Sequence, residues 1–305
     1  MTAFFQAVVD GVITGTLYSL LGLAFVLIYR STHFINFAQG EMATLTTFIG
    51  WTLLSTGIPY GVTFALVLLI GAALGGVIEG VVVRPALQMR SVNELTISVG
   101  LFLVIGAITV GIYGGDVRQI DAPIRGRPLV LAGLSIPRYG LFVVGCAVAL
   151  MLVLWAFFRW TTAGLALRAT ASNQYAADLA GIRTNRMLTL GWALAGAAGA
   201  ASGLLLAPIV GLSTQMMLLV LVSALSAAVL GGLTSPIGAV VGGITIGVLQ
   251  NLVGAYLDDV LDVVGVTITD ANSYREIAAA VLLVGVLVVR PGGLFGRPPG
   301  SLERV

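Results

Sequence analysis

The chain has 305 residues, of which 58% are hydrophobic and only 9% are charged, and its mean hydropathy is +1.05. Soluble domains carry roughly a quarter charged residues, so this composition excludes a soluble fold and indicates an all-α, polytopic transmembrane helical bundle. The net charge is +2 without any basic run, which excludes the electrostatic surface that nucleic-acid binding requires.

The residue inventory also excludes several kinds of catalytic and metal site. All 15 basic residues are arginine, and a P-loop ATPase needs a lysine to reach the nucleotide phosphates. One cysteine (Cys146) and one histidine (His33) cannot form a zinc site or an iron–sulfur cluster. We therefore expect no catalytic residues, no bound metal and no enzymatic activity in this chain.

Long apolar segments recur along the whole chain. A helix needs about 20 apolar residues to cross the ~30 Å hydrocarbon core of a bilayer. The strong candidates are 5–29, 61–83, 95–113, 139–158, 187–210, 216–233, 237–257 and the short 274–289. Segment 42–58 is weaker, and the sequence leaves open whether it crosses or re-enters. We predict eight or nine membrane passes.

Arginine placement orients these passes, since cytoplasmic loops are enriched in basic residues. Ten arginines fall on one side if 42–58 crosses, which places the N-terminus outside and the C-terminus in the cytoplasm: Arg30, Arg84, Arg90, Arg159, Arg168, Arg183, Arg186, Arg290, Arg297 and Arg304. The opposite, external side then receives loops 114–138 and 258–273.

Glycines spaced four apart occur inside the predicted spans. The pairs are Gly11/Gly15, Gly71/Gly75, Gly76/Gly80, Gly199/Gly203, Gly238/Gly242 and Gly243/Gly247. Small residues at this spacing allow helix backbones to approach closely in lipid, so the simplest interpretation is tight packing. A Gly/Pro break over 231–238 is the best candidate for a helix interruption near a substrate path.

Polar residues concentrate in the stretch 33–42, between the first two apolar segments. Asn36, Gln39 and Glu41 belong to it, and spacing alone leaves open a solvated cytoplasmic turn. Two other acidic residues, Asp10 and Glu79, fall near the predicted membrane rims, where the cost of a charge is smaller. We interpret Glu79, five residues before Arg84, as structural or as one partner of an ion pair.

The longest polar insertion on the cytoplasmic side covers 161–186. Ser172 can cap a short helix Asn173–Ala180, and Gly181 can end it in the left-handed conformation. Ala176, Ala177 and Ala180 would form a small, smooth face with Asp178 beside it. This pattern predicts a docking element for a soluble partner; an amphipathic helix lying on lipid headgroups would carry larger apolar residues and more arginine.

Four stretches carry a resemblance to a known family: INFAQGEM after GTLYSLLGLAFVLIYRS, then GLALRATASNQYAADLAGIRTNRM, AAVLGGLTSPIGAVVGGITIGVLQN and VLVVRPGGLFG. In this order they resemble the LivH-type permeases of bacterial branched-chain amino acid ABC transporters. The first is similar to the family signature NFAHGE, with Gln39 where many members carry histidine, and the second is similar to the cytoplasmic coupling loop of the family. Together the stretches span residues 15 to 296.

The resemblance implies a single transmembrane permease domain over 1–305, in the bacterial cytoplasmic membrane, with a coupling loop at 160–186. Its partners would be a second, LivM-like permease subunit, two ATPase subunits that use ATP, and an extracytoplasmic substrate-binding protein. This chain itself would bind no cofactor. The substrate path would involve Asn36, Gln39, Glu41, Ser235 and Gly238. Coupling to the ATPase would involve Asn173, Ala176, Ala177, Asp178, Ala180 and Gly181.

Two alternatives remain at this point. A permease of the same family could carry urea or short amides in place of branched-chain or other neutral amino acids. An ion-coupled secondary transporter or channel would instead need intramembrane charges as coupling sites, for which only Asp10, Glu41 and Glu79 qualify. The sequence also leaves open whether the chain pairs with a different permease or with itself.

Overall fold

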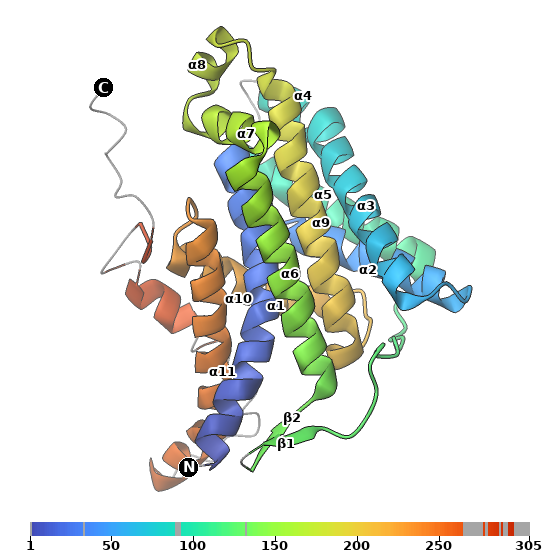
Figure 1. Ribbon diagram of the computed structural model, residues 1–305, viewed down its shortest axis with the longest axis vertical. Helices are drawn as coiled ribbons and strands as arrows, with labels where there is room; N and C mark the ends of the chain where they lie inside the picture. The colour runs from blue at the N-terminus through green and yellow to red at the C-terminus, as the bar shows by residue number, and fades with distance from the viewer. Residues whose placement is uncertain are drawn as a thin grey trace. The chain divides into compact units, whose positions relative to one another are not determined.

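The computed structural model describes residues 2–32, 34–88, 93–131 and 133–264, with shorter pieces between 277 and 295. The described part is dominated by helices and has one β-hairpin (Figure 1). In chain order the elements are α1 (Thr2–Thr32), α2 (Gln39–Ser55), α3 (Tyr60–Ile78), the π-helix η1 (Glu79–Val83), α4 (Arg84–Gln88), α5 (Glu94–Tyr113), β1 (Leu129–Leu131), β2 (Leu134–Ile136), α6 (Arg138–Trp160), α7 (Thr162–Ser172), α8 (Gln174–Leu179), α9 (Thr184–Val210), α10 (Met216–Gly231) and α11 (Pro236–Val264).

Within the described ranges, six helices are long and apolar enough to cross a membrane. They are Thr2–Thr32, Tyr60–Leu87, Glu94–Tyr113, Arg138–Trp160, Thr184–Val210 and Pro236–Tyr256. Each coincides with a segment that the sequence predicts, which confirms the polytopic helical fold.

The remaining predicted passes differ from these six. α10 has 16 residues and α2 has 17, so both are shorter than a typical span. The predicted segment 274–289 lies largely outside the described residues. Most of α2 is buried by protein, which explains its weak hydropathy, since a helix enclosed by other helices can carry threonine, glutamine and glutamate. The number of eight or nine passes stays a prediction.

The chain divides into two compact units, each described by itself. The first unit comprises Met1–Gly22, Ala122–Cys146 and Val222–Val305, and the second comprises Leu23–Asp121 and Ala147–Leu221. The prediction of one domain over 1–305 stays a prediction.

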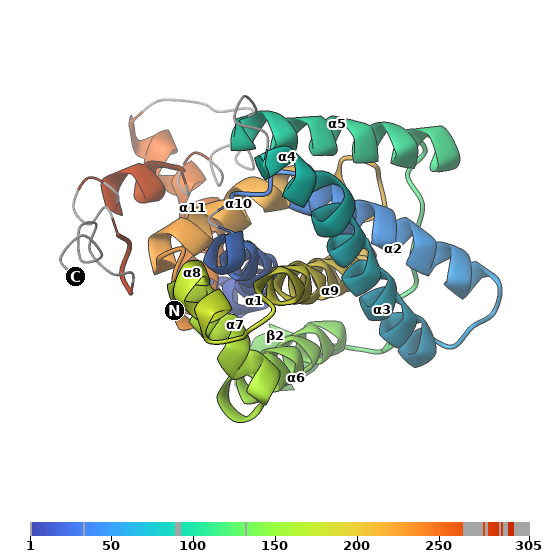
Figure 2. The same cartoon turned by 90° about the horizontal axis from the view of Figure 1, so that it is seen from above.

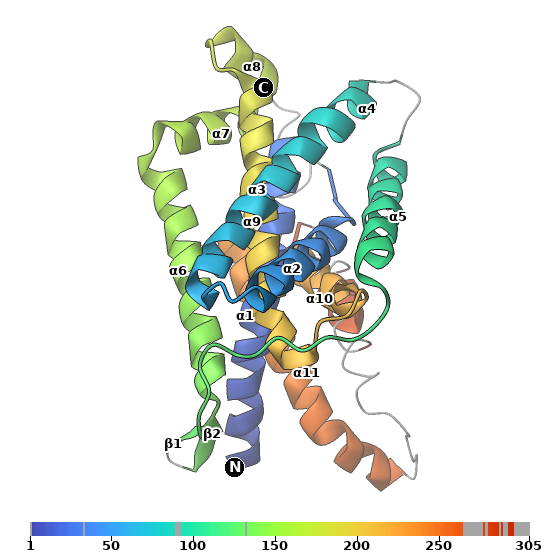
Figure 3. The ribbon, with the colours of Figure 1, turned by 90° about the vertical axis from the view of Figure 1, so that its right-hand side faces the viewer.

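In the second unit, α3 packs along α9, and α2 contacts both of them; Figures 1 and 3 show α3 and α9 side by side. Glycine makes this close packing possible, because a Cβ on Gly71 would lie 2.6 Å from the backbone oxygen of Gly196. A Cβ on Gly75 would overlap the backbone oxygen of Trp192. Trp192 is fully buried and belongs to the apolar core of this unit.

In the first unit, the N-terminal part of α1 packs on α11, and α11 lies beside α10 (Figure 2). A Cβ on Gly15 would lie 2.7 Å from the backbone oxygen of Gly243, and Ser19 Oγ donates a hydrogen bond to the backbone oxygen of Val240 at 2.9 Å. In every predicted glycine pair except Gly76/Gly80, a Cβ added to either glycine would press on backbone or side-chain atoms of a neighbouring helix. The packing interpretation of these pairs therefore holds.

Candidate functional site

The link between α1 and α2 is a buried, hydrogen-bonded segment of the second unit. Phe34 is fully buried, and its ring lies 5.5 Å from the ring of Trp192 on α9. The Oδ1 atom of Asn36 accepts a hydrogen bond from the backbone N–H of Ala38 at 3.1 Å, which closes a local turn before α2. Asn36 is fully buried, so the alternative of a solvated cytoplasmic turn is wrong for this residue.

Gln39 fixes the beginning of α2 against α9. Its Nε2 donates to the backbone oxygen of Ala195 at 3.0 Å, and its Oε1 accepts from Asn36 Nδ2 at 3.5 Å. Gly199 provides the space for this amide, because a Cβ there would overlap Nε2. The structure thus brings Asn36 and Gln39 together and satisfies them with protein partners.

Glu41 differs from both of these residues. It lies in the first turn of α2 and is only 7% exposed. No described residue forms a hydrogen bond or an ion pair with its carboxylate. A Cβ placed on Gly106 of α5 would lie 3.2 Å from Glu41 Oε2, so the absence of a side chain at position 106 leaves room for the carboxylate. A carboxylate inside a helical bundle without a protein partner is costly, so Glu41 is the residue of this segment that keeps its place as a candidate for the substrate path.

Three features around this segment were not predicted from the sequence. Ser98 Oγ accepts a hydrogen bond from the backbone N–H of Phe37 at 2.6 Å, and Gly106 makes space beside Glu41. The Nε1 atom of Trp192 is buried and has no hydrogen-bond acceptor among the described residues. Nothing in the local sequence marks these three positions, because their surroundings are made by residues far away in the chain.

Ser235 and Gly238 belong to the first unit, at the predicted Gly/Pro break. The break is confirmed: α10 ends at Gly231 and α11 begins at Pro236. Ser235 Oγ accepts a hydrogen bond from the backbone N–H of Gly238 at 3.0 Å, so it caps α11. A Cβ on Gly238 would overlap the backbone oxygen of Gly231. Both residues therefore have structural roles, and their part in a substrate path stays a prediction.

The short helix predicted in the insertion 161–186 is α8, and Figures 1 and 3 show it beyond the end of α7. Asn173 caps it, since its side chain accepts from the backbone N–H of Ala176 at 2.9 Å. The prediction that Ser172 caps it is wrong, because Ser172 is the last residue of α7. Gly181, at φ +80°, ends the helix as predicted, with the Ile182 N–H donating to the Ala177 oxygen at 3.0 Å.

The exposed face of α8 also differs from the predicted one. Ala177 is only 4% exposed, so it packs inward and is not part of the outer surface. Ala176 and Ala180 are exposed as expected, and the large apolar side chains Tyr175 and Leu179 are 74% and 73% exposed. These two are four residues apart and lie on one helix face.

Asp178 joins α8 to the next long helix. Its Oδ1 atom accepts a hydrogen bond from the hydroxyl of Thr184 at 2.7 Å, and Thr184 is the buried first residue of α9. This hydrogen bond connects α8 directly to the beginning of α9. Asp178 positions the helix and also remains at the surface.

Asp10 and Glu79, the two other acidic residues considered as intramembrane charges, have partners. Glu79 forms an ion pair with Arg84, whose Nε donates to Glu79 Oε1 at 3.0 Å. The Oε2 atom of Glu79 also accepts a hydrogen bond from the Thr189 hydroxyl at 2.8 Å. Asp10 accepts from Gln6 Nε2 at 3.2 Å. Across the described ranges, no three His, Cys, Asp or Glu side chains come together as a metal site would require.

The apolar helices and their glycine-mediated packing define a multi-pass helical membrane protein. The chain belongs to the family described as "Branched-chain amino acid transport system / permease component", whose model matches residues 7–288. It is thus a permease component, and the family together with the six long apolar helices places it in the bacterial inner membrane.

Individual relatives agree with the family over nearly the full chain. The LivH high-affinity branched-chain amino acid permease of Salmonella typhimurium is 27% identical over 318 residues, which cover 99% of this chain and 98% of the relative. A probable LivH permease of Methanocaldococcus jannaschii is 29% identical and covers 96% and 93%. The solved structure of PsaBC from Streptococcus pneumoniae in complex with Fab has a TM-score of 0.50 at 14% identity, covering 96% and 93%, and supports the fold alone.

Proposed function

We propose that this chain is the permease subunit of an ABC importer that carries branched-chain or other neutral amino acids across the cytoplasmic membrane. The family match and the names of the relatives support the transport role and the substrate class. The observation that carries the proposal is α8, a capped helix that exposes Tyr175 and Leu179 in a chain without any lysine for a P-loop. Such a chain needs an ATPase from elsewhere and a surface on which to receive it.

Two separate ATPase subunits would dock on α8 and use ATP, while this chain would bind no cofactor and catalyse no reaction. Tyr175 and Leu179 would fill a groove on the ATPase, in the manner of an amphipathic helix in an apolar groove. ATP can shift the permease only if α8 binds the two ATPase states with different affinity. The hydrogen bond from Thr184 to Asp178 would pass that difference to α9.

Substrate recognition in the membrane would depend on Glu41. An amino acid is a zwitterion, and its ammonium group needs an acceptor inside the bundle. Glu41 is 7% exposed and lies beside Gly106, and its carboxylate has no partner among the described residues. Asn36 and Gln39 would hold the segment that presents it, through their bonds to the backbone of Ala38 and Ala195.

The complete importer would contain a second, LivM-like permease subunit and an extracytoplasmic binding protein. Urea and short amides are the alternative substrates within the same family. The family match does not favour an ion-coupled carrier or channel, and Glu79 and Asp10, two of its three candidate coupling charges, are engaged with neighbouring side chains.

The test combines co-purification with transport. We expect the full chain to co-purify with two ATPases and a second membrane subunit, and the assembly to need ATP for amino acid uptake in proteoliposomes. The double variant Tyr175→Ser/Leu179→Ser should lower ATPase retention and uptake at least tenfold, because central interface anchors are typically worth about 1–2 kcal/mol each. The matched control is Val130→Ser/Leu131→Ser, which removes two exposed apolar side chains from strand β1. This variant should retain the ATPases.

Normal ATPase retention in the Tyr175→Ser/Leu179→Ser variant would remove the docking role of α8. A chain that purifies alone and moves amino acids in liposomes without ATP would overturn the whole proposal.

A further inference from the structure

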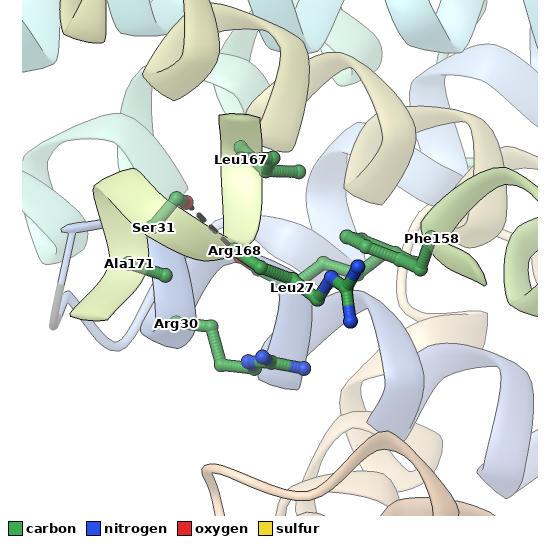
Figure 4. Close-up of a pocket in the computed structure, with 7 residues that line it drawn as sticks. All are labelled: Leu27, Arg30, Ser31, Phe158, Leu167, Arg168 and Ala171. Carbon is green, nitrogen blue, oxygen red and sulfur yellow. Dashed lines mark hydrogen bonds between the residues drawn. The ribbon is translucent and has the colours of Figure 1, made fainter. Parts of the chain in front are cut away.

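The pocket between α1, α6 and α7 is too small to hold a solute (Figure 4). Arg30 and Arg168 are among the residues that line it, but its walls are almost entirely apolar and it has room for about one water. Aromatic and cationic side chains of the second unit gather instead at the loop that follows α5.

α2 and α5 share a seam that contains Glu41 and that is covered by two stacked rings. Gly106 of α5 lies beside Glu41 of α2. Two helical turns further along both helices, the rings of Phe48 and Tyr113 stack with their centres 4.8 Å apart. Two turns of helix advance about 10 Å. Since both helices run toward the predicted external side, the stack lies between Glu41 and that side.

Arg118 covers this stack from the loop after α5. Its Cζ atom lies 4.2 Å from the centre of the Trp51 ring, 5.7 Å from that of Tyr113 and 6.0 Å from that of Phe48. Its Nη2 donates a hydrogen bond to the backbone oxygen of Tyr113 at 2.7 Å. A cation over aromatic faces is attracted by their electron density. The guanidinium therefore holds the ends of α2 and α5 together, and none of the described residues forms an ion pair with it.

The backbone of Arg118 also ties this loop to the link between α9 and α10. The N–H of Arg118 donates to the oxygen of Leu212, and the N–H of Leu212 donates to the oxygen of Arg118, both at 2.8 Å. Each arm of this bridge joins its helix through a glycine at positive φ, Gly114 (+77°) after α5 and Gly211 (+81°) after α9. Glycine adopts such conformations at little steric cost, and residues at the ends of elements are common hinges. Both arms can therefore turn where they leave their helices.

We propose that Arg118, its bridge to Leu212 and the Phe48–Tyr113 stack form an external gate, which opens to let the substrate reach Glu41. The inference rests on the proposed function, since it takes Glu41 as a substrate contact. A transporter with alternating access has to close one side of its path while the other side is open. Ring contacts and single hydrogen bonds suit such a gate, because each is weak enough to exchange. Arg118 is a positioning residue, which holds the rings and does not contact the substrate.

A disulfide across the bridge tests whether it has to open. Residues that exchange both backbone hydrogen bonds in an antiparallel pair have Cα atoms about 5.5 Å apart, which suits a disulfide. We use the full assembly in a Cys146→Ser background. With Arg118→Cys/Leu212→Cys, the reduced assembly should take up amino acids in proteoliposomes. Oxidation should lower uptake about tenfold, because a locked gate excludes the substrate, and a reductant should restore it while the ATPases stay bound throughout.

Val130→Cys/Ser135→Cys is the matched control, because these residues pair across the β1–β2 hairpin in the same predicted external loop. Oxidation should leave its uptake unchanged. Full uptake in oxidised Arg118→Cys/Leu212→Cys, with the disulfide verified by mass spectrometry, would overturn the gate and leave the proposed function standing. Absence of ATP-dependent uptake in the unaltered assembly would instead overturn the proposed function.

A second measurement tests the gate without the disulfide. In a Cys146→Ser/Glu41→Cys background, a small membrane-impermeant thiol reagent labels position 41 from the external side, and the labelling rate is measured. Arg118→Gln should raise this rate about fivefold, because loss of the ring contacts favours the open gate. Arg127→Gln removes the same charge from an exposed position of the same loop and should leave the rate unchanged. An unchanged rate in Arg118→Gln, or an equal rise in Arg127→Gln, would overturn the role of Arg118.

Discussion

At the scale of single residues, two buried glutamates of this chain have opposite surroundings. Glu79 is 1% exposed and bonded to Arg84 and Thr189, whereas Glu41 is 7% exposed and has no bonding partner among the described residues. A buried charge that loses its partner is strongly destabilising, while a charge that never had one is a cost to the fold. The contrast assigns a structural role to Glu79 and leaves Glu41 for the proposed substrate contact.

We therefore predict opposite effects for two matched substitutions. Glu41→Gln should reduce amino acid uptake at least tenfold and leave assembly and melting temperature unchanged or slightly raised, since it removes an unpaired charge. Glu79→Gln should lower the melting temperature by several degrees, because it deprives Arg84 of its ion pair, at a cost of about 1–3 kcal/mol. Uptake in proteoliposomes and thermal melting of the purified complex measure both, and unaltered uptake kinetics in Glu41→Gln would remove this residue from the substrate path.

At the scale of elements, glycine decides how closely the helices pack. α3 and α9 meet through Gly71, Gly75 and Gly196, where any Cβ would press on the backbone of the facing helix. In lipid this close packing replaces the hydrophobic driving force that is missing between membrane helices. Not every glycine of these helices is a packing contact: a Cβ placed on Gly61 of α3 would have no atom of a neighbouring element within 4 Å.

Substitutions on α3 should separate these two cases. Gly75→Ala should destabilise the chain by about 1–3 kcal/mol, the usual cost of overpacking a close contact. Gly61→Ala, the same substitution in the same helix, should be neutral or slightly stabilising, because alanine is the better helix former and has room there. Thermal melting in detergent compares the two, and equal melting temperatures would contradict the close approach of α3 and α9.

At the scale of the whole molecule, arginine placement predicts the orientation in the membrane. It predicts that the insertion 161–186 lies on the cytoplasmic side and that loop 114–138 lies outside. The chain carries a single cysteine, Cys146, which makes this orientation simple to test.

In a Cys146→Ser background, we expect a cysteine at Ser172 to react with a membrane-impermeant maleimide only after the cytoplasmic side is exposed. A cysteine at Val130, in the hairpin, should react in intact cells from which the outer membrane has been removed. Both positions are exposed in the structure, so failure to label reports the membrane side. The reverse pattern would invert the predicted topology and would place α8 away from any cytoplasmic ATPase.

The sequence by itself determined the features that depend on composition and on local chain geometry. Apolar runs of about 20 residues predicted the six helices that are long and apolar enough to cross a membrane, since length and hydropathy suffice for that inference. The break between α10 and α11 and the end of α8 at Gly181 also follow from local chemistry, since proline and glycine restrict or permit particular backbone conformations. The choice between Ser172 and its neighbour Asn173 as the cap was wrong because both residue types can cap a helix.

Tertiary structure alone decided the features that join residues distant in the chain. The sequence marks Glu41 as polar but does not show that Gly106 makes room for it, nor that Gln39 is held by Ala195. Burial of Ala177 and the meeting of Arg30 with Arg168 at one pocket are likewise absent from any local pattern. The physical reason is that burial, packing and hydrogen-bond partners depend on which helices contact each other. Composition and periodicity report only the length and polarity of each helix by itself.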